Sequence, residues 1–226
     1  MKFSTISLGI TAAITLSACT NDSDPAKTVT GVDFIGMDAP VTAVQRATVY
    51  SDAQVTVTYS DGTTATKNLE YKQLFATTDS INGKTVGGLY DAVGQPLMDS
   101  SVAGNTIQYV AETPDANSLL QVTGADATPL GVSGNPLFMV THYEYVKQNN
   151  NGDSEYGNLP MAMSLATIDQ NKTNGDLSVV EYDNIDMSAI KGLWIPCAGS
   201  LSPWNTRLGS EEYEPNARTY EGDNTA

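Results

Sequence analysis

The stretch that decides the fold is VTVTYSDGTTAT, which runs from Val55 to Thr66. β-branched residues alternate on both sides of an Asp-Gly pair, and this period of two is typical of a strand with one buried face. An Asp-Gly pair between such segments is the strongest short-range signal of a β-hairpin, because tight hairpin turns need residues that accept a positive φ. The stretch therefore predicts two antiparallel strands joined at Asp61, which we interpret as a turn residue.

The strand pattern extends in both directions from this hairpin. It starts at Ala47-Thr48-Val49-Tyr50, and residues 82–105, rich in Gly and small polar residues, indicate long loops. Five further strand segments are expected at 106–110, 119–122, 137–146, 161–168 and 177–182. Only residues 186–191 indicate a short helical turn, and no longer segment after the N-terminal region has helical periodicity. The pattern predicts an all-β fold, for which a sandwich, a barrel or propeller blades are the alternatives.

The N-terminus predicts export. Residues 1–18, MKFSTISLGITAAITLSA, carry Lys2 and then an apolar run that is too short to span a bilayer. The run ends in Leu16-Ser17-Ala18-Cys19, which resembles the lipobox of bacterial lipoproteins and implies a lipid on Cys19. An ordinary signal peptide with a chance cysteine is the alternative. We expect an exported protein anchored in the cell envelope, in the outer membrane, on its periplasmic side or at the cell surface.

The predicted domain organisation follows from this N-terminus. Residues 1–18 are the lipoprotein signal peptide, residues 19–45 are a lipidated tether and entry segment, and residues 46–226 are the β-rich domain.

The charge balance limits the partners of the chain. The sequence has 11 Lys and Arg against 26 Asp and Glu, a formal charge of −15. Nucleic acid is therefore excluded as an expected partner, because binding it needs a dense basic face. An acidic surface also repels free anions, so an anionic substrate needs metal ions to bring it in. With 40% hydrophobic residues, the chain has the composition of a globular protein.

The mature chain keeps a single cysteine, Cys197, in the segment PCAGSLSPWNTRLGSEEYE of residues 196–214. An unpaired thiol in an oxidising compartment is vulnerable unless it is buried or engaged. A thiolate suits iron or another transition metal, and the nearby Glu211, Glu212 and Glu214 offer the oxygen ligands that calcium prefers. These residues alone leave two interpretations open: a buried structural cysteine beside surface acids, or a metal site.

Three other residues, His142, Arg207 and Arg218, could act in catalysis or binding, but the sequence favours a structural or solvated role for each. His142 is the only histidine and lies in an apolar strand, which favours a packed residue over a ligand. A single histidine also leaves little room for a serine hydrolase, which needs a base beside its nucleophile. Arg207 and Arg218 are expected to be solvated rather than to contact a phosphate.

The cysteine segment resembles the signature of PhoX-type alkaline phosphatases and the related exported proteins grouped with them. The resemblance runs from Pro196 to Thr206 and on from Leu208 to Glu212: Cys, Gly, Ser, then Pro-Trp and Thr, then paired glutamates. Similar pieces lie upstream at 57–63, 74–75, 87–91, 117–120 and 140–145. The family implies a β-propeller that hydrolyses phosphomonoesters with a cluster of iron and calcium ions. When the ligand roles of the family are transferred to this sequence, Cys197 becomes the iron ligand and Glu212 the calcium ligand. Glu211 is not expected at the same ion, because adjacent strand residues point to opposite faces.

Family members are much longer than this chain. A propeller blade takes about 40–50 residues, so about 200 residues make at most about four blades. We therefore expect the N-terminal blades of a larger propeller, without the later metal ligands and inactive alone, which could associate with a missing C-terminal half. The alternative is a non-catalytic envelope lipoprotein that binds cations or a partner.

Overall fold

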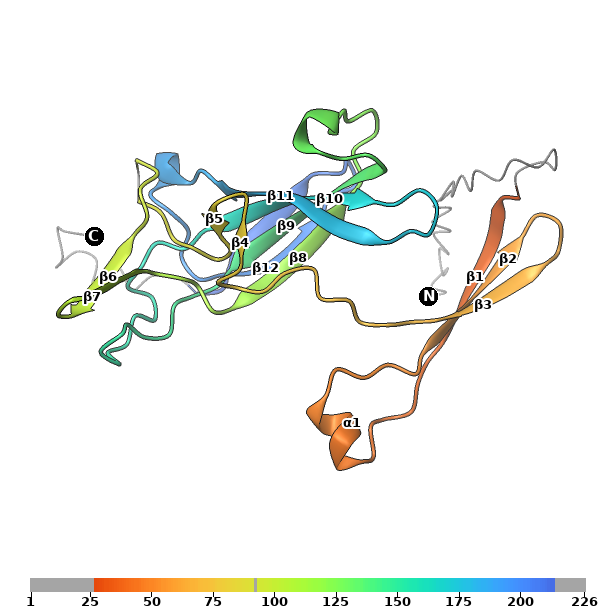
Figure 1. The fold of residues 1–226 in the computed structure, drawn as a ribbon, viewed down its shortest axis with the longest axis horizontal. Helices are drawn as coiled ribbons and strands as arrows, with labels where there is room; N and C mark the ends of the chain where they lie inside the picture. The colour runs from red at the N-terminus through yellow and green to blue at the C-terminus, as the bar shows by residue number, and fades with distance from the viewer. Residues whose placement is uncertain (1–26, 92, 214–226) are drawn as a thin grey trace, which may run out of the picture. The chain divides into compact units, whose positions relative to one another are not determined.

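The computed structural model describes residues 27–91 and 93–213, and almost all of its regular structure is antiparallel β (Figure 1). The all-β prediction is confirmed, and the strands form several small sheets, none of which is closed within this part of the chain. The predicted signal peptide, with the lipidation predicted at Cys19, lies outside the described residues. No described helix is long and apolar enough to cross a membrane. Contacts divide the chain into two compact units, residues 1–73 and 74–226, which are described separately below.

The first unit holds a three-stranded antiparallel sheet in the order β1-β2-β3, formed by β1 (Val29–Ile35), β2 (Gln54–Tyr59) and β3 (Thr64–Asn68). The predicted hairpin is β2–β3, and Asp61 shapes its turn by accepting hydrogen bonds from the backbone N–H of Thr63 at 3.0 Å and from its hydroxyl at 2.6 Å. Lys27 pairs with Asp61 at 2.5 Å, and this contact with Lys27, followed by the bonds from Thr63, holds the pKa of Asp61 well below its ordinary value.

Two features of this unit differ from the sequence expectations. The segment expected as a tether contributes β1, which pairs Val32 with Val57 and Phe34 with Val55. The strand expected from Ala47 to Tyr50 is wrong: Ala47 instead ends a short helix, α1 (Ala43–Ala47), and the residues after it are not in a strand. A capping box decides this, because the Thr42 side chain accepts from the N–H of Gln45 while the Gln45 side chain accepts from the N–H of Thr42.

The second unit is built on a four-stranded antiparallel sheet in the order β11-β10-β9-β8 (Figure 1). Its strands are β8 (Pro114–Leu120), β9 (Asn135–Tyr143), β10 (Met163–Gln170) and β11 (Leu177–Ile185), which confirm the predicted strands with shifted ends. One face of the sheet carries the buried core, in which the hydroxyls of Tyr143 and Tyr182 lie 3.0 Å apart. The N–H of Gly87 donates to Tyr182 at 3.0 Å and so ties the segment before β8 to this face.

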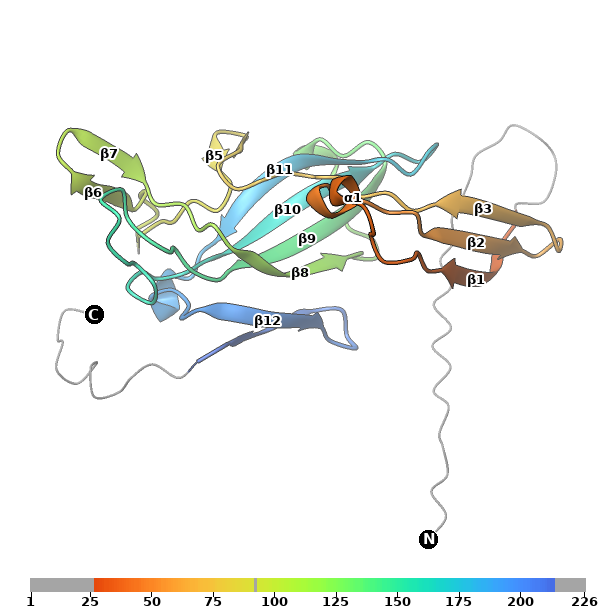
Figure 2. The same ribbon diagram turned by 90° about the horizontal axis from the view of Figure 1, so that it is seen from below.

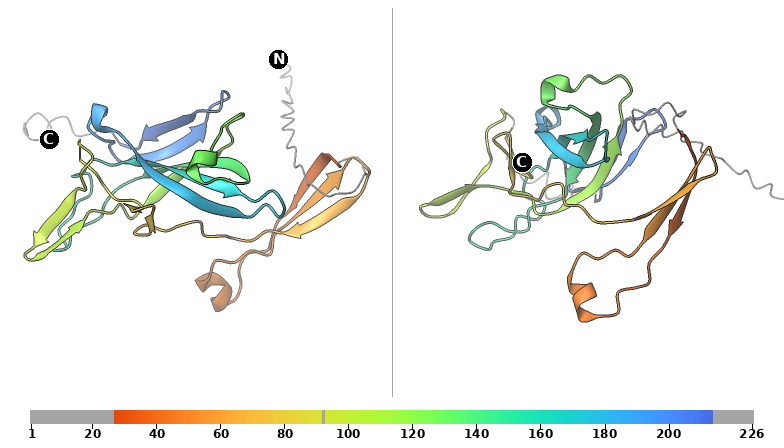
Figure 3. Two further views of the ribbon diagram at one scale, coloured as in Figure 1. Left: turned by 45° about the horizontal axis from the view of Figure 1, so that its top comes forward. Right: turned by 45° about the vertical axis from the view of Figure 1, so that its right-hand side comes forward.

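The segment expected as long loops, residues 82–105, contains the strands β5 (Lys84–Thr85) and β6 (Met98–Val102). They form small hairpins with β4 (Ser80–Ile81) and β7 (Asn105–Gln108), and β7 confirms the strand predicted at 106–110 with shifted ends. The hairpin β6–β7 extends away from the four-stranded sheet (Figure 3). Two short 3-10 turns also occur, η1 (Thr128–Leu130) and η2 (Ser188–Ile190), and η2 confirms the helical turn predicted at 186–191.

A two-stranded hairpin, β12 (Pro196–Leu201) and β13 (Arg207–Glu211), lies over the other face of the sheet and contacts β8 and β9 (Figure 2). Adjacent residues of a strand point to opposite faces, so Tyr143 packs in the core while its neighbour His142 faces this hairpin. The hairpin carries the segment with the family resemblance, which is therefore brought onto strands that lie far away in the sequence.

Candidate functional site

Three side chains from three strands converge where the hairpin meets the sheet. They are Asp115 of β8, Glu144 directly after β9, and Cys197 of β12, and their possible ligand atoms all lie within 4.8 Å of one another. Asp115 is exposed, whereas Glu144 and Cys197 are half-buried. The cluster therefore lies where solvent and a dissolved ion reach it.

Glu212 joins this cluster from the end of β13. Its backbone N–H donates to the carbonyl of Ile195 at 3.0 Å, and its negative charge acts on both Cys197 and Glu144. Glu211 is engaged elsewhere, because its carboxylate accepts from the N–H of Trp194 at 2.7 Å. Glu212 thus lies beside the cluster of Asp115, Glu144 and Cys197, whereas the adjacent Glu211 is directed at another partner. Glu214 lies outside the described residues.

The electrostatics of the cluster are dominated by acidic groups. A hydrogen bond to Asp115, then burial, then the negative charges of Asp115, Glu144 and Glu212 raise the pKa of the Cys197 thiol to about 11. Burial, the charge of Asp115 and the contact with Glu212 raise the pKa of Glu144. Without a bound cation the Cys197 thiol is therefore protonated at neutral pH, and a bound cation would favour its charged form.

Two tyrosines border the cluster. The hydrogen bond to Glu212 raises the pKa of Tyr213, and burial followed by the charges of Glu212 and Glu144 raises that of Tyr156. The ring of Tyr156 also packs against that of Tyr145, with centroids 5.0 Å apart. The neutral hydroxyl of Tyr156 can donate a hydrogen bond at the edge of the cluster, whereas that of Tyr213 is directed at Glu212.

Arg207 attaches the hairpin to the sheet. Its guanidinium donates to the Ser118 hydroxyl and, at 3.0 Å, to the carbonyl of Ala116. Gly199 leaves the necessary room, since a Cβ there would collide with the guanidinium. The expectation of a solvated Arg207 is wrong, because its side chain is half-buried between the two layers. Arg218 lies outside the described residues.

His142 is packed rather than directed at the cluster. It is only 1% exposed, and its ring lies against Gly209, where an added Cβ would collide with it. Neither ring nitrogen has a hydrogen-bond partner in the described part of the chain. Burial and the charge of Arg207 lower the pKa of His142, and the backbone of Cys197 opposes this shift without completing a hydrogen bond of good geometry. The interpretation as a packed residue is confirmed.

Sequence reasoning missed two members of the cluster. Glu144 lies in a segment that carries the resemblance, VTHYEY, but received no role there. Asp115 has no motif around it, and only the pairing of β8 with β9, which places Pro114 opposite Tyr143, brings it to the site. A local pattern could not have identified it.

Comparisons with models of protein families, with curated proteins and with solved structures found no match for this chain. The evidence on function is therefore the motif around Cys197 and the geometry of the cluster of Asp115, Glu144 and Cys197.

Proposed function

We propose that the chain is the N-terminal part of a PhoX-like, metal-dependent phosphomonoesterase that is inactive until the rest of the protein is present. The observation that carries this proposal is the convergence of the Cys197 thiol with the carboxyl groups of Asp115 and Glu144 within 4.8 Å. The charge of Glu212, the other residue singled out by the resemblance, acts on both Glu144 and Cys197. Asp115 and Glu144, which are distant in the sequence, thus lie next to Cys197 and near Glu212, the two residues that the motif makes metal ligands.

The donor set fits the ions that the family implies. Cys197 supplies a soft sulfur ligand for iron, and Glu212 supplies a hard oxygen ligand for calcium. Asp115 and Glu144 lie beside the thiol and would complete the coordination of either ion. When bound, such ions supply the positive charge that polarises phosphate oxygens and activates an oxygen nucleophile. They would also offset a chain charge of −15 that repels phosphate.

The residues of the chain have their own roles in this proposal. The thiol of Cys197 is protonated at neutral pH, so an ion that binds there would displace its proton. The hydroxyl of Tyr156, on which the charges of Glu212 and Glu144 act, would donate a hydrogen bond to a phosphomonoester at the cluster.

The proposal extends to the architecture. The sheet β8–β11 has the four antiparallel strands of a propeller blade. We assign it to one of the N-terminal blades of a larger propeller, with further blades and metal ligands supplied by a C-terminal half. A lipid on Cys19 would hold the protein in the cell envelope.

Turnover of a chromogenic phosphomonoester tests the proposal. The purified protein is assayed with p-nitrophenyl phosphate, with calcium and iron added and then chelated, alone and with the C-terminal half of a longer PhoX-type protein. We expect turnover only in the completed protein, lost on chelation and in Cys197→Ala. Asp52→Asn, in the other unit, is the control and should leave turnover unchanged. Turnover that survives both chelation and Cys197→Ala would contradict the proposal.

One observation favours a second candidate, a non-catalytic cation-binding lipoprotein. The charges that act on Cys197 and Glu144 are those of acidic groups, which attract a cation and repel a phosphate. Calorimetry with calcium and with iron distinguishes the two. Binding that requires Cys197 and Glu212, without turnover in the completed protein, supports this second candidate.

A further inference from the structure

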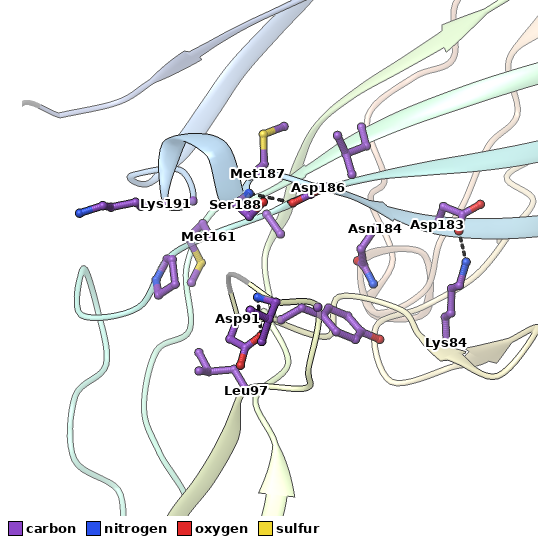
Figure 4. A pocket seen from close by; sticks show the side chains of 17 residues that line it. Lys84, Asp91, Leu97, Met161, Asp183, Asn184, Asp186, Met187, Ser188 and Lys191 are labelled. Atoms are coloured by element: carbon purple, nitrogen blue, oxygen red, sulfur yellow. Dashed lines mark hydrogen bonds and ion pairs between the residues drawn. The ribbon is translucent and has the colours of Figure 1, made fainter.

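A cavity of about 830 Å³ lies on the core face of the four-stranded sheet, the face opposite the hairpin that carries Cys197. Three segments line it: the loop after β5, the entry to β10, and the end of β11 with η2 (Figure 4). The volume is within the range of pockets that bind small molecules. It belongs to neither the acidic cluster nor the residues of the family motif.

The walls of the cavity are largely apolar. Leu97, Met161, Ile185 and Met187 line it, and Met161 is only 3% exposed. Methionine side chains are flexible and polarizable, so two of them allow the walls to adapt to a flat apolar molecule.

The charged groups of the cavity are already satisfied or directed elsewhere. Lys84 pairs with Asp183, and Asp91 accepts hydrogen bonds from two backbone N–H groups of its own loop at 2.9 Å. Asp186 accepts from the N–H of Ser188 at 2.8 Å, and the side chain of Lys191 points away from the cavity (Figure 4). A charged ligand would therefore lose its hydration without gaining an unpaired counter-charge.

Asn184 is the polar exception. It is half-buried on β11, opposite the fully buried Ser164 of β10, and its Oδ1 is buried without a hydrogen-bond partner in the described residues. Its side chain points toward the segment of Asp91 and Leu97 (Figure 4). A terminal amide that rotates presents either a donor or an acceptor, and leaving it unpaired costs free energy that a bound partner recovers.

We propose that this cavity binds an uncharged, mainly apolar small molecule whose carboxamide group pairs with the side-chain amide of Asn184. The apolar body of the ligand occupies the space between Leu97 and the two methionines. The site acts independently of the phosphatase proposed above, because none of its residues belongs to the metal cluster.

The test uses naphthalene-2-carboxamide as the probe and methyl-labelled methionines as the reporters. The probe is titrated into the purified protein, and the methyl resonances of Met161 and Met187 are followed by NMR, with Met37 of the other unit as an internal reference. We expect saturable shifts of the two cavity methionines, with a Kd of about 1 mM or tighter for a probe of this size. Naphthalene-2-carboxylate, which has the same shape and a charge, is expected to bind at least about five-fold more weakly.

Two variants complete the test. Asn184→Leu keeps the volume and removes the amide, so we expect carboxamide binding to weaken by about five-fold. Asn68→Leu, on β3 of the other unit, is the matched control and should bind like the unaltered protein. Met187→Trp fills the cavity and should abolish the shift of Met161 while near-ultraviolet circular dichroism shows a folded protein. The proposal is overturned if the cavity methionines do not shift, if the carboxylate binds as well as the carboxamide, or if Asn184→Leu binds unchanged.

Discussion

Arg207 donates a hydrogen bond of 3.0 Å to the carbonyl oxygen of Ala116, the residue next to Asp115. This bond joins the hairpin that carries Cys197 and Glu212 to the strand that carries the third acid of the site. Arg207, which lies between the cysteine and the glutamates without being one of the residues that carry the resemblance, thus helps to fix the distance between ligands from separate sheets.

Substitution of Arg207 should therefore weaken both the fold and ion binding. Arg207→Ala removes two hydrogen bonds from a half-buried charged group, and we expect a loss of about 1.5–3 kcal/mol in the free energy of unfolding, measured with urea. Arg207→Lys keeps the charge but not the forked geometry, so it should recover part of the stability and less of the calcium affinity. If Arg207→Ala binds calcium as the unaltered protein does, the guanidinium does not position the site.

Gly209 should be intolerant of alanine. A Cβ at this position would collide with the His142 ring, so Gly209→Ala should destabilise the protein by about 1–3 kcal/mol in urea unfolding. Gly36→Ala is the matched control, because nothing lies within 4 Å of its added Cβ, and it should change stability by less than about 0.5 kcal/mol.

A double variant separates steric conflict from other causes. His142→Ala removes the ring that the new methyl group would meet, so Gly209→Ala should cost much less in that background. An equal cost in both backgrounds would show that His142 is not the obstacle.

The Cys197 thiol should react slowly in the metal-free protein. A pKa of about 11 leaves little thiolate at pH 8, so alkylation by iodoacetamide should be slower than that of an ordinary cysteine. Asp115→Asn removes the negative hydrogen-bond partner, lowers the pKa of the thiol and should speed alkylation by about ten-fold. Asp52→Asn in the other unit should have no effect. A thiol that reacts rapidly at pH 8 and is insensitive to Asp115→Asn would contradict this account.

Glu144 should make the metal-free protein less stable as the pH rises. Its pKa is raised in the folded state, so its contribution to stability is complete below its ordinary pKa and is lost as the pH rises through the higher, folded value. Compared with Glu144→Gln, the unaltered protein should therefore lose stability between pH 4 and pH 8 in urea unfolding.

Calcium should remove the loss of stability that Glu144 causes as the pH rises. With a bound cation the ionised form of Glu144 is favoured, so added calcium should stabilise the unaltered protein at pH 8 and leave Glu144→Gln almost unchanged, as measured by the melting temperature. Equal stabilisation of both proteins would place calcium elsewhere.

Local signals in the sequence predicted much of the fold. The β2–β3 hairpin follows from the turn at Asp61, and the long strands of the second unit follow from their alternation. The strand predicted from Ala47 is wrong because the capping box of Thr42 and Gln45 starts the helix α1 there, although β-branched residues follow it.

The site could be predicted only in part. Cys197 and Glu212 lie on one hairpin, so a single stretch of sequence holds both. The roles of Asp115 and Asn184 could not be predicted. They depend on which strands pair and in which register, and on which segments pack against the sheet, and no local sequence pattern specifies these tertiary properties.

The hairpin β12–β13 lies over the four-stranded sheet without joining its ladder: in the described part of the chain, no backbone hydrogen bond links Pro196–Leu201 or Arg207–Glu211 to β8 or β9. Side-chain contacts such as those of Arg207 hold it there. We therefore expect docking of the hairpin to be separable from formation of the sheet, so that partial opening would take the thiol away from Asp115 and Glu144 before the core begins to melt.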